Sequence, residues 1–181
     1  IQLILEKSGY FKDLLMSGTE ESEDRRNNLQ ELINAATQFE EETEDGDVEK
    51  WNPDDWKYNE DYLYGIDLYN YHFYWEAHEA WEGLWLAAVR RSSEHMFIQG
   101  LIKTGAALLK VRMASFEIQD LIGARTLSKS GIDLLSRVGV SKFMGLDIVS
   151  YLESYSEFIN PIFDNKIPDI NQKTPRITLD F

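Results

Sequence analysis

The sequence of 181 residues contains no cysteine. A chain without thiols forms no disulfide, holds no metal through thiolates and uses no cysteine nucleophile. This composition fits a reducing compartment, so we expect a soluble protein of the cytoplasm. No apolar run approaches the roughly 18 residues of a membrane-spanning helix, because the best candidate, 96–111, contains Gln99 and Lys103. No signal peptide is recognisable near the first residue.

Cationic residues are also scarce. Lysine and arginine number 18 against 32 aspartates and glutamates, which gives a formal net charge of −14. An acidic surface repels nucleic acids and anionic membranes, so we expect neither as a partner. The charge is uneven, because residues 1–56 hold 16 acidic and 5 basic residues, whereas 57–181 hold 16 and 13. This asymmetry predicts two segments, an acidic one and one whose charges are nearly balanced. Since the chain begins with Ile1 instead of methionine, we expect a fragment or a processed form.

Strand signals are nearly absent, and three of the four prolines follow residue 160. Apolar residues at spacings of three and four predict helices over 3–16, 19–39, 60–69, 74–90, 94–113, 115–137 and 147–158. Short connections favour antiparallel neighbours. We therefore predict an all-α protein, a small antiparallel helical bundle with an N-terminal helical arm and an extended C-terminal tail. The expected division is an acidic arm at 1–48, the bundle at 57–160 and the tail at 161–181.

The segment 74–85 has the highest density of aromatic and titratable side chains that could form a site. It contains three tryptophans, three glutamates and one histidine in about three helical turns. One side of this helix is predicted to be a core stripe. The stripe consists of Tyr74, Ala77, Trp81, Leu84, Trp85 and Ala88. Glutamate is seldom buried without a partner. The helix must therefore either bury its charges in a satisfied network or present a site.

Five motifs in order resemble a known family. They are YGIDLYN at 64–70, YWEAHEAWEGLW at 74–85, QGLIK at 99–103 with the alanines 106–107, GAR at 123–125 and GLD at 145–147. On these motifs residues 57–160 resemble the bacterial and archaeal family called domain of unknown function 309. The resemblance implies a small helical bundle and leaves its activity open. The chain departs from the family at His72, where the family usually has a small residue, often glycine.

A second resemblance concerns residues 1–45. Ser8-Gly9-Tyr10 and the acidic segment 20–32 are similar to a helical segment of UvrD/PcrA-type DNA helicases. The ATP-binding signature G-x-x-x-x-G-K-[ST] is absent from the sequence, so we expect no motor activity. An accessory role in DNA repair rests on this likeness alone.

The leading interpretation of segment 74–85 is a buried polar network. Gln99 and Lys103 lie four residues apart on the next predicted helix. If the two helices are antiparallel neighbours, Lys103 neutralises Glu79 or Glu82, and Gln99 bonds His78. This predicts a non-catalytic binding or scaffold module, without cofactor, whose partner is a protein or a second copy of the chain. The full set of candidates is Trp75, Glu76, His78, Glu79, Glu82, Trp85, Gln99, Lys103 and Arg125.

Two alternatives remain open for the same helix. In the first, His78 and Glu82 bind one metal ion and Glu79 acts as the general base of a hydrolase, as in H-E-x-x-H sites. The second histidine of that motif is missing, and no third ligand is evident. In the second, the tryptophans line a groove for a small ligand. Arg125 is expected to form a salt bridge within the bundle, with a phosphate contact as its alternative.

Overall fold

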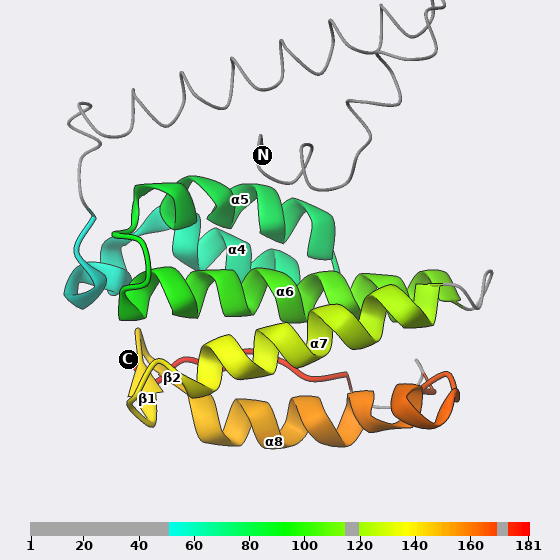
Figure 1. Ribbon diagram of the computed structural model, residues 1–181. Helices are drawn as coiled ribbons and strands as arrows, with labels where there is room; N and C mark the ends of the chain where they lie inside the picture. Colours follow the sequence, from blue (N-terminus) through cyan, green and yellow to red (C-terminus); the bar gives the residue numbers. More distant parts are fainter. Residues whose placement is uncertain (1–50, 115–119, 170–173) are drawn as a thin grey trace, which may run out of the picture. The chain divides into compact units, whose positions relative to one another are not determined.

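The computed structural model describes residues 51–114, 120–169 and 174–181 (Figure 1). The predicted arm at 1–48, its helices and its helicase-like segment lie outside this range. The elements, in chain order, are η1 (Pro53–Tyr58), α4 (Glu60–Asn70), α5 (Tyr74–Ala87), α6 (Ser93–Ala114), α7 (Asp120–Ser136), β1 (Lys142–Phe143), β2 (Leu146–Asp147), α8 (Ile148–Ile159) and η2 (Asn160–Asp164). The prediction of an all-α bundle is confirmed, with one very short hairpin added.

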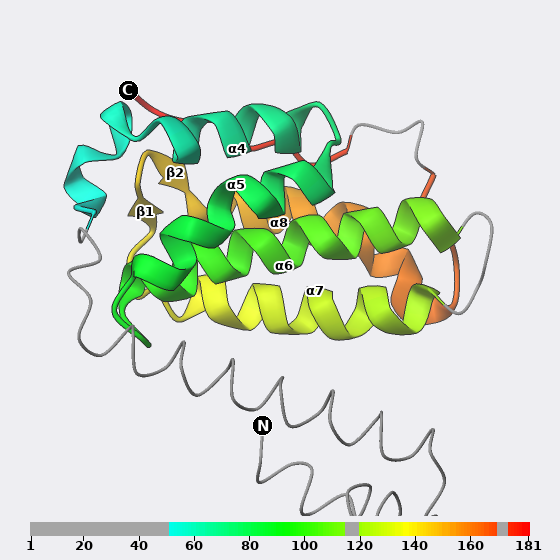
Figure 2. The ribbon, with the colours of Figure 1, turned by 90° about the horizontal axis from the view of Figure 1, so that it is seen from above.

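Successive helices run in alternate directions, and α6 is the central one (Figures 1 and 2). It packs against α5 on one side and α7 on the other. Its apolar residues Phe97, Ile98 and Leu101 have no exposed surface. Small residues bring α6 and α7 together, since a Cβ on Gly100 would lie 2.6 Å from Leu135 Cγ. None of the helices in the described ranges is long and apolar enough to cross a membrane.

Polar side chains fix several helix ends. The Asn59 side chain accepts from the amide of Tyr62 at 2.9 Å at the start of α4, and Asp147 accepts from that of Ser150 at 3.0 Å at the start of α8. Asp147, the first residue of the helix predicted at 147–158, is thus the N-cap of α8. Helix α5 ends at Ala87, earlier than the predicted residue 90, because Ala88 takes an extended conformation with ψ of 142°.

A two-residue turn joins β1 to β2. Met144 and Gly145 both have positive φ, 47° and 77°, as a type I′ hairpin turn requires. A Cβ on Gly145 would also lie 2.4 Å from the ring of Trp56. The Tyr62 hydroxyl donates to the carbonyl of Met144 at 2.9 Å and ties the turn to α4. The motif GLD at 145–147 therefore forms the turn and strand that precede α8.

Hydroxyl groups form a chain of hydrogen bonds inside the core. The Tyr69 and Tyr151 hydroxyls lie 2.7 Å apart, and Tyr151 donates to Thr104 Oγ1 at 2.8 Å. The Tyr155 hydroxyl lies 2.9 Å from Ser128 Oγ. These buried side chains come from α4, α6, α7 and α8, so the bonds fix how four helices meet. Sequence reasoning did not find this chain.

Residues 174–181 are extended, as predicted for the tail, and they lie along α4 (Figure 2). The Asn70 side chain donates to the carbonyl of Ile177 and accepts from its amide, both at 2.8 Å. Ile177 is only 3% exposed and belongs to the hydrophobic core. The amide of Asp180 donates to the carbonyl of Gly145 at 2.9 Å, so the tail joins α4 to the hairpin.

Candidate functional site

The side of α5 that faces away from the core carries the charged residues. Glu76, Glu79 and Glu82 are all exposed, and Trp75 is 58% exposed. The predicted core stripe is confirmed where Tyr74, Ala77, Trp81 and Leu84 are buried, while Trp85 and Ala88 are only partly buried. The helix therefore separates a core face from an acidic face that includes one large apolar side chain.

Two ring pairs lie on α5 and the start of α6, and we call them together the aromatic strip: Trp75 with His78, and Trp85 with His95. The rings of Trp75 and His78 have centroids 5.6 Å apart, and those of Trp85 and His95 lie 5.7 Å apart. His95 belongs to the first turn of α6, so the strip spans two helices. Burial, followed by the charge of Arg90, lowers the pKa of His95, while Glu94 opposes this effect.

Two nitrogen atoms of the strip are buried without a hydrogen bond. They are His78 Nδ1 and Trp85 Nε1, which have no partner among the described residues. Two other indoles do have partners, because Trp51 Nε1 donates to the carbonyl of Leu84 at 2.9 Å and Trp81 Nε1 to that of Tyr62 at 3.1 Å. A buried polar atom left unsatisfied costs about 1–3 kcal/mol. Such atoms are rare in folded proteins and call for an explanation.

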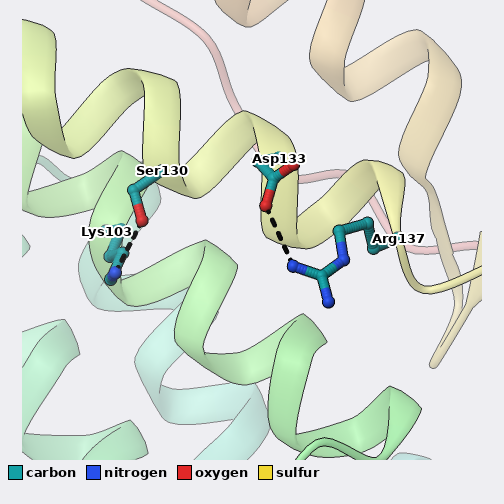
Figure 3. Close-up of polar contacts among 4 residues, drawn as sticks. All are labelled: Lys103, Ser130, Asp133 and Arg137. Carbon is teal, nitrogen blue, oxygen red and sulfur yellow. Dashed lines mark hydrogen bonds and ion pairs between the residues drawn. The ribbon is translucent and has the colours of Figure 1, made fainter.

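The expectation of a buried Glu–Lys–Gln network is wrong. Lys103 Nζ donates to Ser130 Oγ of α7 at 2.6 Å, on the other side of α6 (Figure 3). Over the described ranges, no hydrogen bond or ion pair joins Lys103 to Glu79 or Glu82. The reason is the orientation of α6, since neighbouring Gly100 and Thr104 contact α7. Figure 3 also shows the exposed pair of Asp133 on α7 and Arg137 just after the end of α7, at 3.2 Å.

The two remaining polar candidates also differ from expectation. Gln99 is half-buried on α6, and no hydrogen bond to His78 is found in the part of the chain that the structure describes. Arg125 donates through Nε to the carbonyl of Ile162 at 2.7 Å and through Nη2 to Asn165 Oδ1 at 2.5 Å. Both acceptors are uncharged, so the expected salt bridge is replaced by contacts that hold η2 against α7.

Metal binding was an alternative for His78 and Glu82. The described ranges contain no group of three or more histidines, aspartates and glutamates placed to hold one ion. His78 and Glu82 supply two ligands, and the carboxylate of Glu82 is exposed. The metal-dependent hydrolase stays a prediction that elemental analysis can test.

A comparison with known families finds a match for part of the chain. Residues 62–118 match the model of a family described as a domain of unknown function (DUF309). The DUF309 match begins in α4 and includes all of α5 and α6, so it contains the whole aromatic strip. It supports the resemblance drawn from the motifs at 64–70, 74–85 and 99–103. DUF309 is an uncharacterised helical domain, and no curated protein matches the chain.

One structural feature near the DUF309 motifs escaped sequence reasoning. A cavity opens beside His72, at the turn between α4 and α5. The available signal was the resemblance described above, which leads us to expect a small residue, often glycine, where this chain has His72. His72 has a φ of 69°, a left-handed conformation that glycine adopts without strain. The imidazole therefore stands at a backbone position that favours glycine.

Proposed function

We propose that the bundle is a non-catalytic binding module and that the aromatic strip is its contact surface for a protein partner. The observation that carries the proposal is the indole of Trp75, which is 58% exposed on a side of α5 that also exposes the carboxylates of Glu79 and Glu82. Exposed aromatic anchors of this kind are enriched in protein interfaces.

The acidic groups beside the strip indicate the partner's chemistry. Glu79 and Glu82 are exposed, and no described cation pairs with either. Electrostatic complementarity favours a partner that places lysine or arginine opposite them. The indole of Trp75 favours an apolar or cationic side chain, because cations bind the face of a tryptophan ring. The proposed partner is therefore a protein segment with basic residues next to an apolar one.

The absence of cysteine permits a test by site-specific cross-linking of the full chain. Gly83 lies on the exposed side of α5, and a side chain there meets nothing within 4 Å. Gly83→Cys is labelled with a photoreactive group and irradiated in an extract of cells that contain the native protein. Glu153→Cys, on the exposed side of α8, is the matched control. Cross-linked peptides are then sequenced by mass spectrometry.

The proposal expects one major product from position 83 whose cross-linked peptide contains lysine or arginine. Adding Trp75→Ala or Glu82→Lys removes this product without changing the circular dichroism spectrum. Position 153 does not give it. Equal products from both positions, a product indifferent to the added substitutions, or no product at all would contradict the proposal.

The metal-dependent hydrolase is tested separately. The full chain is purified without chelator, and its zinc, manganese and iron contents are measured. Stoichiometric metal that is lost in Glu82→Ala favours the hydrolase over the binding module. Metal content unchanged by that substitution argues against it.

A further inference from the structure

The tail segment, residues 174–181, lies on the bundle as an extended strand with two different faces. Pro175 and Ile177 are buried and Leu179 packs against the core, whereas residues 176, 178 and 180 are exposed. This alternation is that of a β-strand with one covered side. Every second side chain from 175 to 179 therefore packs onto the bundle.

The backbone of the tail segment is held as well as its side chains. The Asn70 side chain of α4 donates to the carbonyl of Ile177 and accepts from its amide, as the opposite residue of a neighbouring strand does. Leu179 also forms an antiparallel bridge with Leu146 of β2, so the tail segment adds to the hairpin. Main-chain contacts combined with alternate buried side chains characterise the binding of a peptide by strand addition.

Aromatic and cationic side chains receive residues 180 and 181. The ring centroids of Phe181 and Trp56 lie 5.2 Å apart, and Lys57 Nζ lies 5.5 Å from the centroid of the indole and 6.0 Å from that of the phenyl ring. The carboxylate of Asp180 pairs with Lys142 of β1. Two lysines therefore stand beside the acidic end of the tail segment, although the whole chain has a net charge of −14.

These contacts all involve parts of the chain distant from the tail segment in sequence. Over the described ranges, its hydrogen bonds, ion pair and ring contacts reach residues 56–146. On the side of α8, which precedes it, a hollow of about 550 Å³ is lined by both elements. Because the tail segment is held by α4 and the hairpin, the same contacts are available to the tail segment of another molecule.

We propose that this tail-binding surface, formed by Trp56, Lys57, Asn70, Lys142 and Leu146, docks the tail segment of a second copy, so that two chains exchange their tails. Each copy offers one surface and one tail segment, and mutual exchange therefore closes a two-fold dimer. The connection from η2 to the tail segment is nine residues long, 165–173. A chain of that length can span up to about 30 Å, which is enough to reach a neighbouring molecule. This inference is independent of the proposed function, because the tail-binding surface shares no residue with the aromatic strip.

The lack of cysteine allows exchange to be trapped in the full chain. Lys142→Cys marks the tail-binding surface and Asp180→Cys marks the tail segment, and both positions are exposed. The two variants, one of them isotope-labelled, are mixed, incubated overnight and treated with a short bismaleimide. Mass spectrometry then measures the dimers that join one chain of each kind. The control mixture combines Lys142→Cys with Glu153→Cys, on the exposed side of α8. The doubly substituted chain Lys142→Cys/Asp180→Cys shows whether the reagent joins the two positions within one molecule.

The proposal expects at least about fivefold more mixed dimer than in the control mixture, with a yield that rises with protein concentration. Adding Ile177→Asn to the Asp180→Cys chain abolishes the mixed dimer, because that tail segment no longer seats its apolar side chain. Adding it to the Lys142→Cys chain instead raises the yield by about threefold or more, since the competing tail of that chain is weakened. Loss of folding would lower the yield in both cases, so the opposite signs distinguish exchange from unfolding.

Ile177→Ala replaces Ile177→Asn if circular dichroism shows that the latter is unfolded. The proposal is overturned if the mixture gives no excess over the control at concentrations up to about 1 mM. It is also overturned if the substitution at Ile177 has the same effect in both chains. Either result means that the tail segment is seated only in its own chain. Absence of the cross-link within the doubly substituted chain overturns it too, because the tail segment would then not lie on this surface.

Discussion

The indole of Trp81 lies directly against Gly65. A Cβ built on this glycine would fall 2.1 Å from Trp81 Nε1 and 2.5 Å from Cε2, and Trp81 has no exposed surface into which it can move. The same Nε1 donates to the carbonyl of Tyr62 at 3.1 Å. The contact sets the distance between α4 and α5, because no larger residue fits between them.

The first prediction concerns this contact. Gly65→Ala forces the indole to shift and strains its hydrogen bond, so we expect the free energy of unfolding to fall by about 1–3 kcal/mol. Urea denaturation followed by tryptophan fluorescence measures the change. Gly83→Ala is the matched control, because a Cβ there meets nothing within 4 Å. The control is expected to be stabilising by about 0.5–1 kcal/mol, since alanine favours helix interiors over glycine. If both substitutions changed the free energy of unfolding by the same amount, the close contact between Gly65 and Trp81 would be contradicted.

A second prediction concerns the hydroxyl chain. Thr104→Val keeps the shape of the side chain but removes the oxygen that accepts from Tyr151 and donates to the carbonyl of Leu101. We expect a loss of about 1–3 kcal/mol in the free energy of unfolding, because buried groups are left unsatisfied. Thr126→Val, the same change at an exposed position of α7, is expected to stay within about 0.5 kcal/mol of the parent. A Thr104→Val protein as stable as the parent would show that the chain has no energetic role.

A third prediction concerns alkaline pH. Burial raises the pKa of Tyr74 to about 12, and it raises the pKa values of Tyr62, Tyr69, Tyr151 and Tyr155 still further. Unfolded tyrosine ionises near pH 10. Above about pH 10 the unfolded state therefore binds fewer protons than the folded state, and stability falls as the pH rises. The stabilisation is fully present below that pH.

Urea midpoints between about pH 9 and pH 11.5 test this sign, together with the ultraviolet absorbance of phenolate. The midpoint is expected to fall steadily, and the buried tyrosines should ionise only as the protein unfolds. A constant midpoint with ionisation of all tyrosines in the folded state would be inconsistent with their burial.

A fourth prediction separates the contact of Lys103 from the network expected at first. Lys103→Ala should cost about 0.5–1.5 kcal/mol, since it removes a half-buried hydrogen bond to Ser130. Breaking a buried ion pair would cost about 3–5 kcal/mol. A double-mutant cycle of Lys103→Ala with Ser130→Ala should show coupling. In the cycle of Lys103→Ala with Glu82→Gln, the two changes in the free energy of unfolding should add within about 0.5 kcal/mol. Measurable coupling between Lys103 and Glu82 would instead support the buried network.

Local signals were sufficient for most of the fold. The limits of α4, α6 and α8 followed from apolar periodicity and from caps such as Asp147, which act within one helical turn. Periodicity does not say which neighbour covers which face of a helix. For this reason Lys103 was assigned to α5 although it faces α7. The same limitation applies to Gln99.

The site was harder to predict because its features depend on contacts between distant residues. The segment 74–85 drew attention through its composition, yet the exposure of its glutamates depends on how α5 is turned in the bundle. The hydroxyls of Tyr69 and Tyr151 are 82 residues apart in sequence, and no local pattern links them. The cavity beside His72 needs a residue of the tail, Thr174, to complete its wall.

The paired hydrogen bonds between Asn70 and Ile177 have a consequence for biosynthesis. They join positions 107 residues apart, whereas α6 and α7 are neighbours in sequence and meet early. During translation the amide group of Asn70 stays hydrated until residue 177 has emerged from the ribosome. The helical hairpins can assemble co-translationally, and α4 is tied to the tail only after residue 177 has been synthesised.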